Sequence, residues 1–316
     1  MYLDWETLLK ISQNIYLNNN LDCGCRFRRI ASKGIRLAIA ITTKCNLKCS
    51  HCFATLNSNE LSVNEWLKIT SQLPDINVSK LIITGGEPLM ISNLEQIILL
   101  SSKNGIAIDL NSNLNSMTQR RAESLMAAGL KEISASLDGC KDFHDSIRNK
   151  PGNFFKVINN IKLLKRLGYK VDIHSASIPS NLKSLPELID ICADLEVSSL
   201  TLISILPKGK ALLQFNLSEL SWNQKSIEVL KKILFEKRAT YNNFMPIRTV
   251  GILVKPIIEE CKMGNDILGI TPDGYLLGCL LSNQNNRVKI VGSTLKSSYI
   301  TLLNNIKRVR HSIECL

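Results

Sequence analysis

Three cysteines within eight residues carry the clearest chemistry in this sequence. Cys45, Cys49 and Cys52 have the spacing C-x3-C-x2-C in the segment TTKCNLKCSHCF. Closely spaced thiolates favour soft metals, so the segment predicts a zinc site or an iron–sulfur cluster. Structural zinc takes four ligands, commonly in paired C-x2-C spacing, and His51 lies directly beside Cys52, where geometry disfavours it as a fourth. Three thiolates instead suit a [4Fe–4S] cluster with one iron open to another molecule.

A second segment, TGGEP at residues 84–88, has a composition that suits close contact with a ligand. Glycine lacks a Cβ, so the backbone at Gly85 and Gly86 can approach a ligand closely. Exposed carbonyl groups there can accept hydrogen bonds from an ammonium group. Glu87 then either adds a complementary charge or fixes the loop. Taken alone, the segment is equally compatible with an ordinary turn between a strand and a helix.

Both segments follow predicted strands of an α/β fold. Short apolar runs alternate with amphipathic helical patterns, which predicts βαβ units and a parallel sheet. We expect strands at residues 36–42, 80–84, 106–110, 132–137, 170–175 and 200–206. We expect helices at residues 63–73, 94–102, 118–128, 154–167, 185–195 and 217–237. Six units in about 175 residues predict a partial (β/α)6 TIM-type barrel. A Rossmann sheet is the alternative, but no G-x-G-x-x-G follows the first strand. Such barrels carry their chemistry at the C-terminal ends of the strands.

The sequence changes character after the last of these units. ITPDGYLLGC, residues 270–279, predicts a β-hairpin that turns at Asp273-Gly274, and residues 295–310 predict a terminal helix. We therefore expect an N-terminal extension, a barrel and a small C-terminal module of hairpin and helix. The predicted domains are residues 1–34, 35–240 and 241–316.

Composition narrows the classes of protein to consider. The 316 residues are 45% hydrophobic and 21% charged, which predicts a well-packed core. No run approaches the ~18 apolar residues of a membrane span, and Asp4 and Glu6 interrupt any secretory signal. We expect a cytoplasmic protein, in which ten cysteines serve metal binding or catalysis rather than disulfides. A net charge of +12 favours anionic partners, although most basic residues are expected on solvated helix faces.

The cysteine triplet followed by Phe53 resembles the signature of the radical SAM superfamily. TGGEP, at residues 84–88, resembles the family's segment that binds the amino end of S-adenosylmethionine. The resemblance implies that Cys45, Cys49 and Cys52 ligate a [4Fe–4S] cluster and that S-adenosylmethionine chelates the open iron. The reduced cluster would cleave S-adenosylmethionine to a 5′-deoxyadenosyl radical, which abstracts hydrogen from the substrate. The protein would supply binding, orientation and shielding.

Further segments resemble the family in chain order. They are residues 111–113 (NSN), 134–139 (SASLDG), 144–154 (HDSIRNKPGNF) and 206–211 (LPKGKA). Lys210 stands where the family has arginine, so it keeps the charge and loses the planar fork that binds carboxylates. Arg148 could bind a carboxylate through two parallel hydrogen bonds, and an ion pair that pins its loop is the alternative role. The resemblance implies these cofactor-binding residues: Phe53, Gly85, Gly86, Glu87, Pro88, Asn111, Asn113, Ser134, Ser136, Asp138, Arg148 and Lys210.

The C-terminal cysteines resemble the opening of an auxiliary-cluster domain called SPASM, or of its shorter form, Twitch. Cys261 and Cys279 have the spacing C-x12-G-x4-C, and the sequence ends where the second cysteine group of a full SPASM domain would begin. The resemblance implies a second iron–sulfur cluster, with Cys315 as a third ligand or with a contribution from Cys23 or Cys25. A domain that has lost its clusters and keeps the hairpin is the alternative, with two buried thiols.

The motif HD-x-x-R-x-x-x-G-x-F is common in the peptide-modifying branch of the family. The resemblance therefore implies an enzyme that crosslinks, forms a thioether in, or epimerises a ribosomally made peptide, which the basic surplus suggests is acidic. It also implies an electron donor such as flavodoxin or ferredoxin. Cys140 is a candidate hydrogen-atom donor to a substrate radical, and a loop cysteine without a role is the alternative.

Other functions stay open at this point. Residues 1–34 are too few for the winged-helix domain that binds leader peptides in many such enzymes, so leader binding would need another surface or a partner. An enzyme acting on a small metabolite, a sugar or an RNA base is one alternative. A non-catalytic iron–sulfur protein is another. Nucleic acid is the weaker partner, because no basic run is interleaved with aromatic residues.

Overall fold

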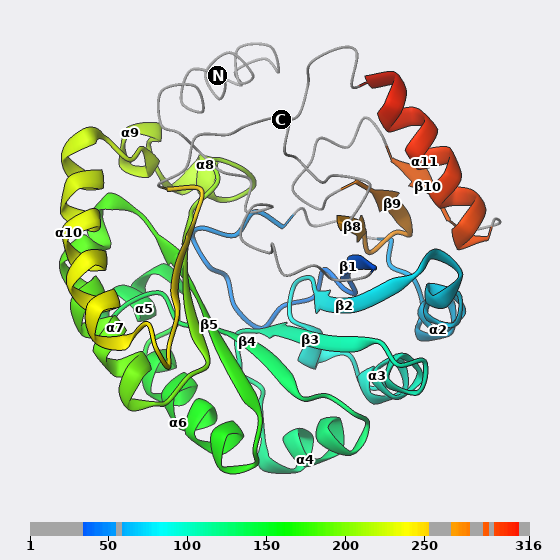
Figure 1. Ribbon diagram of the computed structural model, residues 1–316, viewed down its shortest axis with the longest axis horizontal. Coiled ribbons are helices and arrows are strands. Elements are labelled where there is room, and N and C mark those ends of the chain that lie inside the picture. The colour runs from blue at the N-terminus through cyan, green and yellow to red at the C-terminus, as the bar shows by residue number, and fades with distance from the viewer. Residues whose placement is uncertain (1–33, 55–58, 253–266, 279–286, 291–293, 310–316) are drawn as a thin grey trace.

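The computed structural model describes residues 34–54, 59–252, 267–278, 287–290 and 294–309, with side chains placed up to Leu302. Figure 1 shows the arrangement of these segments. The cysteines of the predicted auxiliary cluster lie outside the described residues, so that cluster stays a prediction. They are Cys261, Cys279 and Cys315, together with Cys23 and Cys25.

One curved sheet organises the described chain, with strand order β10-β9-β8-β1-β2-β3-β4-β5-β6-β7. Neighbours from β8 to β7 are parallel, whereas β9 is antiparallel to both β8 and β10. The strands are β1 (Ile35–Ala40), β2 (Val78–Thr84), β3 (Ala107–Ser112), β4 (Glu132–Ser136), β5 (Lys170–Ser177), β6 (Ser199–Ser204), β7 (Ile247–Val250), β8 (Ile267–Ile270), β9 (Tyr275–Leu277) and β10 (Val288–Lys289).

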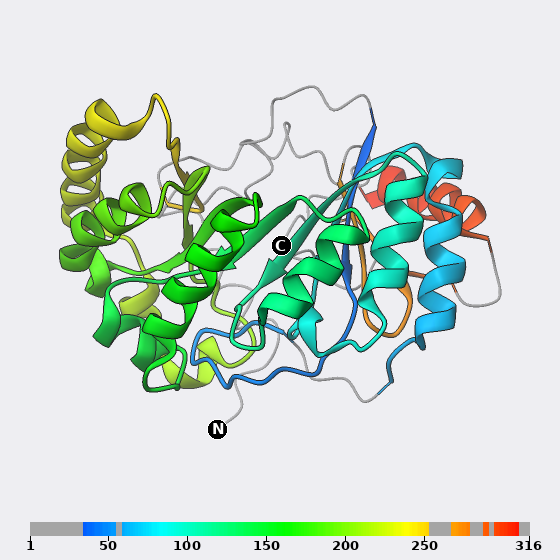
Figure 2. The same ribbon diagram turned by 90° about the horizontal axis from the view of Figure 1, so that it is seen from below.

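Helices cover the outer face of this sheet, and the sheet curves into a partial barrel (Figures 1 and 2). This is the arrangement that right-handed βαβ crossovers produce. The helices are α2 (Val63–Ser71), α3 (Leu94–Lys103), α4 (Gln119–Ala127), α5 (Lys141–Ile147), α6 (Asn153–Arg166), α7 (Leu185–Asp194), α8 (Ala211–Gln214), α9 (Leu217–Leu220), α10 (Gln224–Tyr241) and α11 (Leu295–Val309). The predicted α/β partial barrel is confirmed, and each of its six predicted strands ends within two residues of the prediction.

The strands place alternate side chains on opposite faces of the sheet. In β5, Val171 and Ile173 are fully buried toward the helices, whereas Asp172 and His174 are only partly buried on the inner face. The outer residues of β1 to β6 join the helix faces in one hydrophobic core. Polar side chains on the inner face therefore do not disturb the packing of the core.

Some elements differ from the prediction. The predicted helix at residues 217–237 is interrupted at residues 221–223, because α9 ends at Leu220 and α10 begins at Gln224. Helices α5 and α8 and strand β10 were not predicted. Asn223 causes the break, since its side chain accepts a hydrogen bond from Ser226 N at 2.9 Å and caps α10. Strand β7, which was not predicted, adds a further parallel strand beside β6.

The predicted C-terminal hairpin is formed by β8 and β9. Gly274 has a φ of 82° at the turn, and Tyr275 N donates to Thr271 Oγ1 at 2.9 Å. Because β8 pairs with β1, the hairpin extends the sheet of the barrel. The SPASM or Twitch character of this region, and the division of the chain at residue 240, stay predictions.

No helix in the described part of the chain is both long and apolar enough to cross a lipid bilayer.

Candidate functional site

The three cysteines lie on the loop that follows β1, at the C-terminal end of the sheet. Cys49 is buried, Cys52 is partly buried and Cys45 is exposed. The loop is attached at its start by Glu60, whose carboxylate accepts from Thr43 N at 2.6 Å. Further on, Ser50 N donates to Ile147 O at 2.9 Å. The backbone of the loop is thus held from both sides, which brings all three thiols to one edge of the sheet.

The two glycines of TGGEP pack directly against the cysteine loop. Gly86 N donates to Thr42 O at 2.7 Å, and Glu87 N donates to Lys44 O at 2.8 Å. A Cβ on Gly85 would lie 2.5 Å from Thr42 O, and one on Gly86 would overlap Lys44 O. The close packing of these two loops therefore requires glycine at both positions, whatever ligand the loops bind.

Replacing Gly86 with alanine should weaken cluster binding and stability together. The added methyl group would meet backbone oxygens of residues 43 and 44, which cannot move alone. We expect the free energy of unfolding in urea to fall by about 1–3 kcal/mol, and the iron retained after reconstitution to fall with it. In the control, Gly105→Ala, no atom lies within 4 Å of the new Cβ, so only the positive φ of 70° opposes the change. A Gly86→Ala protein that retains the wild-type amount of iron would contradict this packing argument.

Glu87 also holds the TGGEP loop in place, through the hydrogen bonds of its side chain. Its carboxylate is 1% exposed and accepts from Ser112 Oγ at 2.7 Å, from Asn113 N at 2.8 Å and from Leu89 N at 3.1 Å. Burial raises the pKa of Glu87, although these hydrogen bonds oppose the shift. Of the two roles considered for Glu87, the geometry is that of fixing the loop. Asn113, positioned by Glu87, directs its side-chain amide to Cys45 Sγ at 3.8 Å.

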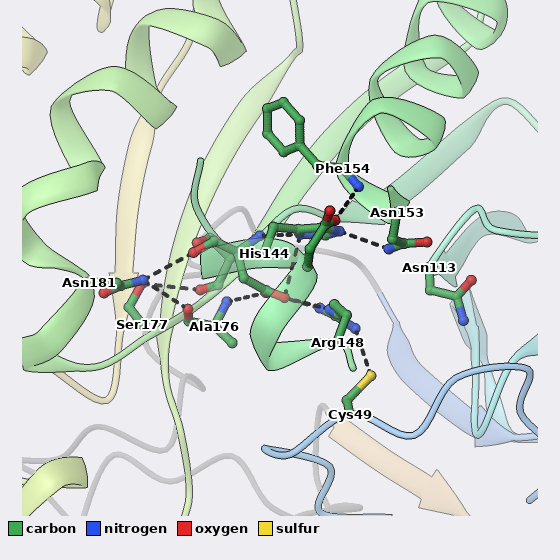
Figure 3. Close-up of polar contacts among 12 residues, drawn as sticks. Cys49, Asn113, His144, Arg148, Asn153, Phe154, Ala176, Ser177 and Asn181 are labelled. Atoms are coloured by element: carbon green, nitrogen blue, oxygen red, sulfur yellow. Dashed lines mark hydrogen bonds and ion pairs between the residues drawn. The ribbon is translucent and has the colours of Figure 1, made fainter. Parts of the chain in front are cut away.

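Arg148 connects the buried cysteine to an ion pair (Figure 3). Its Nη1 donates to Cys49 Sγ at 3.7 Å, while Nε and Nη2 contact the two oxygens of Asp138 at 2.5 and 2.9 Å. Asp138 also accepts from Ala176 N at 2.8 Å, which ties it to β5. Burial alone would raise the pKa of Asp138, but the Arg148 guanidinium holds it well below its usual range. Arg148 thus forms the loop-pinning ion pair and also contacts a candidate metal ligand.

The geometry explains the whole segment HDSIRNKPGNF. His144 Nδ1 accepts from Asp138 N at 3.2 Å, and burial lowers the pKa of His144 to about 4, which keeps the ring neutral. Asp145 accepts from Gly152 N and Phe154 N, both at 2.7 Å, so it closes the loop before α6. Gly152 has a φ of 76°, which favours glycine. His144 therefore supports Asp138, the partner of Arg148, while Asp145 and Gly152 shape the loop that follows Arg148.

The remaining predicted cofactor-binding residues lie around the same strand ends. Asn111 Oδ1 is buried and has no hydrogen-bond partner among the described residues. Ser134 Oγ donates to Asp109 Oδ1 at 3.0 Å, and Ser136 ends β4 on the inner face. Pro88 begins the short 3₁₀ turn that follows Glu87. Of these, the free acceptor on Asn111 is the group best placed to meet a ligand.

The backbone at Gly209 and Lys210 packs against the backbone at Cys52 and Phe53. Lys210 N donates to Cys52 O at 2.9 Å. Gly209 has a φ of 58°, and a Cβ there would lie 2.9 Å from Phe53 Cα. The Phe53 ring is 49% exposed. The segment after β6 therefore closes over the end of the cysteine loop.

Cys140 faces away from the cysteine loop. Its Sγ donates to Ser184 O at 3.5 Å, on the side of α7. Burial and the neighbouring Glu187 raise the pKa of Cys140 to about 12. The hydrogen-donor role of Cys140 stays a prediction, and this orientation does not support it.

Several of these contacts could not be expected from the sequence. Glu60, which holds Thr42 and Thr43, carries no motif signal. Asn181, which donates to Asp138 O at 3.0 Å, was also missed. Strand β7 is too short to show an alternating pattern of hydrophobic residues in the sequence. Only the spacing of HDSIR hinted that His144 takes part.

The donor set fits an iron–sulfur cluster better than a single metal ion. Among the described residues, no three His, Cys, Asp or Glu side chains are close enough to hold one ion. The cysteines of a [4Fe–4S] cluster each bind a different iron, so they lie further apart than the ligands of one zinc. Two of the three sulfurs also have an N–H group within hydrogen-bonding distance, from Asn113 and Arg148. Such contacts are typical of iron–sulfur sites.

Comparison with known proteins agrees with this geometry. The profile of the radical SAM superfamily matches residues 39–192. A probable GTP 3′,8-cyclase from Methanocaldococcus jannaschii is 31% identical over 265 residues, which are 79% of this chain and 86% of that protein. The chain belongs to the radical SAM superfamily. Members of this superfamily use a [4Fe–4S] cluster and S-adenosylmethionine.

Other relatives of this radical SAM protein have different named activities. An AdoMet-dependent heme synthase from Oleidesulfovibrio alaskensis is 28% identical over 55% of this chain. The matched region covers only 46% of the length of that synthase. A PqqA peptide cyclase from Bradyrhizobium diazoefficiens is 25% identical over 78% of this chain and 67% of that enzyme. The crystal structure of Streptococcus suis SuiB bound to its precursor peptide SuiA has the same fold. Its TM-score is 0.68 at 15% identity, over 95% of this chain and 72% of SuiB.

Proposed function

We propose that this chain is a radical SAM enzyme that modifies a peptide. Cys45, Cys49 and Cys52 hold the [4Fe–4S] cluster, and the TGGEP loop with Asn111 receives S-adenosylmethionine. The observation that carries the proposal is the loop of three thiols with Arg148 at Cys49 and Asn113 at Cys45. When bound, the cluster and S-adenosylmethionine supply a 5′-deoxyadenosyl radical that removes hydrogen from an unactivated carbon.

The residues of the chain orient and shelter this chemistry. The Asp138–Arg148 pair fixes Cys49 against β4 and β5, while Glu87 fixes Asn113 and the glycine loop. The segment at Gly209 and Lys210 covers the end of the loop at Cys52. Fixed polar groups of this kind keep ligands in one geometry and exclude water, which a reactive radical requires.

A peptide substrate is supported by three observations. One relative is named a PqqA peptide cyclase, and SuiB, which shares the fold, binds a precursor peptide. The net charge of +12 suits an acidic peptide. An electron donor of the flavodoxin or ferredoxin type completes the proposal, because a reduced cluster requires one electron.

A small metabolite is the second candidate. The relative with 31% identity, of which this chain spans 86%, is named a probable GTP 3′,8-cyclase. GTP is therefore the nucleotide to compare with a peptide.

The test separates the two substrates. We would search the neighbouring open reading frames for a short precursor peptide, incubate the cluster-loaded protein, without oxygen, with dithionite, S-adenosylmethionine and either GTP or that peptide, and follow both by mass spectrometry. We expect 5′-deoxyadenosine to form with the peptide, and the peptide to lose hydrogen or to gain deuterium in D2O. Consumption of GTP while the peptide stays unchanged would overturn the proposal and favour a nucleotide as the substrate.

A further inference from the structure

The inner face of the sheet carries charged side chains that are already paired with one another. Lys80 Nζ lies 2.6 Å from Glu132 and 3.7 Å from Asp109. Further round the barrel, Ser199 Oγ donates to Asp172 Oδ1 at 2.6 Å. These side chains are hydrogen-bonded or ion-paired with one another between β2 and β6. We call this set of residues the polar floor.

A second row of polar residues lies nearer the C-terminal ends of the strands. Strand register places Ser136 beside His174, His174 beside Thr201, and Thr201 beside Arg248. The row thus crosses β4, β5, β6 and β7, which are neighbours in the sheet. We call Ser136, Thr201 and Arg248 the upper row.

The upper row faces inward rather than toward the helices. On β7, Ile247 and Thr249 are 3% and 2% exposed and pack toward α10, so Arg248 between them lies on the opposite face. On β6, Leu200 and Leu202 are fully buried in the same way, which turns Thr201 inward. The side chains of the upper row are only partly buried on this inner face of the sheet.

Unlike the polar floor, the upper row has no partner among the residues that the structure describes. No hydrogen bond or ion pair joins Ser136, Thr201 or Arg248 side chains to any other described residue. The planar guanidinium is well suited to bind an oxyanion through two parallel hydrogen bonds, and neighbouring hydroxyl groups can add a third.

We propose that the upper row is a substrate subsite that binds a carboxylate, with Arg248 as the cation and the hydroxyl of its register neighbour Thr201 as a further donor. Ser136 is two residues from Asp138, whose partner Arg148 contacts Cys49, so the subsite lies just inside the cluster loop. A single cation with one neighbouring hydroxyl matches one carboxylate better than a triphosphate, which carries several negative charges. The assignment of the carboxylate to an acidic residue of a peptide rests on the proposed function.

The test uses two small probes that differ only in charge. N-acetylglutamate α-amide carries one side-chain carboxylate, and N-acetylglutamine α-amide is its neutral isostere. Binding of each would be followed through the unfolding temperature of the cluster-loaded protein, without oxygen, at matched ionic strength. We expect the glutamate probe to raise the unfolding temperature more than the glutamine probe does.

Variants then locate the site. Arg248→Gln should weaken binding of the glutamate probe by about tenfold or more, since a charge-assisted hydrogen bond contributes roughly 1.5–3 kcal/mol. Arg248→Lys should retain part of the binding, and Thr201→Val should weaken it less than Arg248→Gln. Arg120→Gln removes the same charge from an exposed position on α4 and should bind like the wild type.

Three results would overturn the proposal. They are equal binding of the two probes, unchanged binding of the glutamate probe by Arg248→Gln, and an Arg248-dependent response to inorganic phosphate that exceeds the response to the glutamate probe. None of these measurements involves cleavage of S-adenosylmethionine. A failure of the subsite is therefore distinguishable from a failure of the proposed radical chemistry.

Discussion

Replacing Cys45, Cys49 and Cys52 together with alanine should abolish both iron binding and cleavage of S-adenosylmethionine. The three thiols are the proposed ligands of the cluster, and each of them would bind a different iron. We expect iron and sulfide after anaerobic reconstitution to fall to background. With dithionite and S-adenosylmethionine, 5′-deoxyadenosine should form with the wild-type protein and not with the variant.

Cys140→Ser is the matched control for this experiment. It removes a thiol whose Sγ contacts Ser184 O on the side of α7, away from the cysteine loop. We expect this variant to retain the iron of the wild type and its cleavage of S-adenosylmethionine. Full iron loading of the triple alanine variant would sink the ligand assignment. Equal loss of iron in Cys140→Ser would show that the assay reports general damage.

The sequence was most informative where chemistry and chain position coincide. The spacing of the three cysteines and the following TGGEP segment led to the correct superfamily. The alternation of apolar runs placed six strands within two residues of their observed ends. Both signals are local, because a metal loop and a strand are each specified by residues close together in the chain.

The contacts that organise the site could not be expected in the same way. Arg148 and Cys49 are 99 positions apart, and only the folded barrel brings them within 3.7 Å. Gly85 and Gly86 suggested space for a ligand, whereas their neighbours are backbone atoms of the cysteine loop. β7 is four residues long, too short to show a periodicity, so Arg248 carried no signal until the sheet placed it beside Thr201.

These long-range contacts give two of the cysteines different hydrogen-bond donors. The neutral amide of Asn113 donates to Cys45, whereas the charged guanidinium of Arg148 donates to Cys49. The positive charge is balanced by Asp138, so the neighbourhood of Cys49 gains a donor without a net charge of its own. The Asp138–Arg148 pair is therefore both the support of a ligand and a buried element of the fold.

Asp138→Ala should destabilise the cluster-free protein by about 3–5 kcal/mol, because it leaves the Arg148 guanidinium buried without its partner. The Asp138 side chain is fully buried and that of Arg148 is 10% exposed, so water cannot replace the lost carboxylate. The measurement is the free energy of unfolding in urea near pH 7. Near pH 7 the stabilisation of the folded protein by the Asp138 carboxylate is complete, because folding lowers the pKa of Asp138. This stabilisation would be lost only as the pH falls below the pKa of Asp138 in the unfolded chain.

The double variant Asp138→Ala/Arg148→Met distinguishes an unpaired charge from a simple loss of packing. It removes both charges, so we expect it to be more stable than Asp138→Ala alone. Glu95→Ala, which breaks the ion pair with Arg121 between two helices, is the control and should cost about 0–1 kcal/mol. If Asp138→Ala costs no more than Glu95→Ala, or if the double variant is the least stable of the three, the buried pair does not support the loop that carries Cys49.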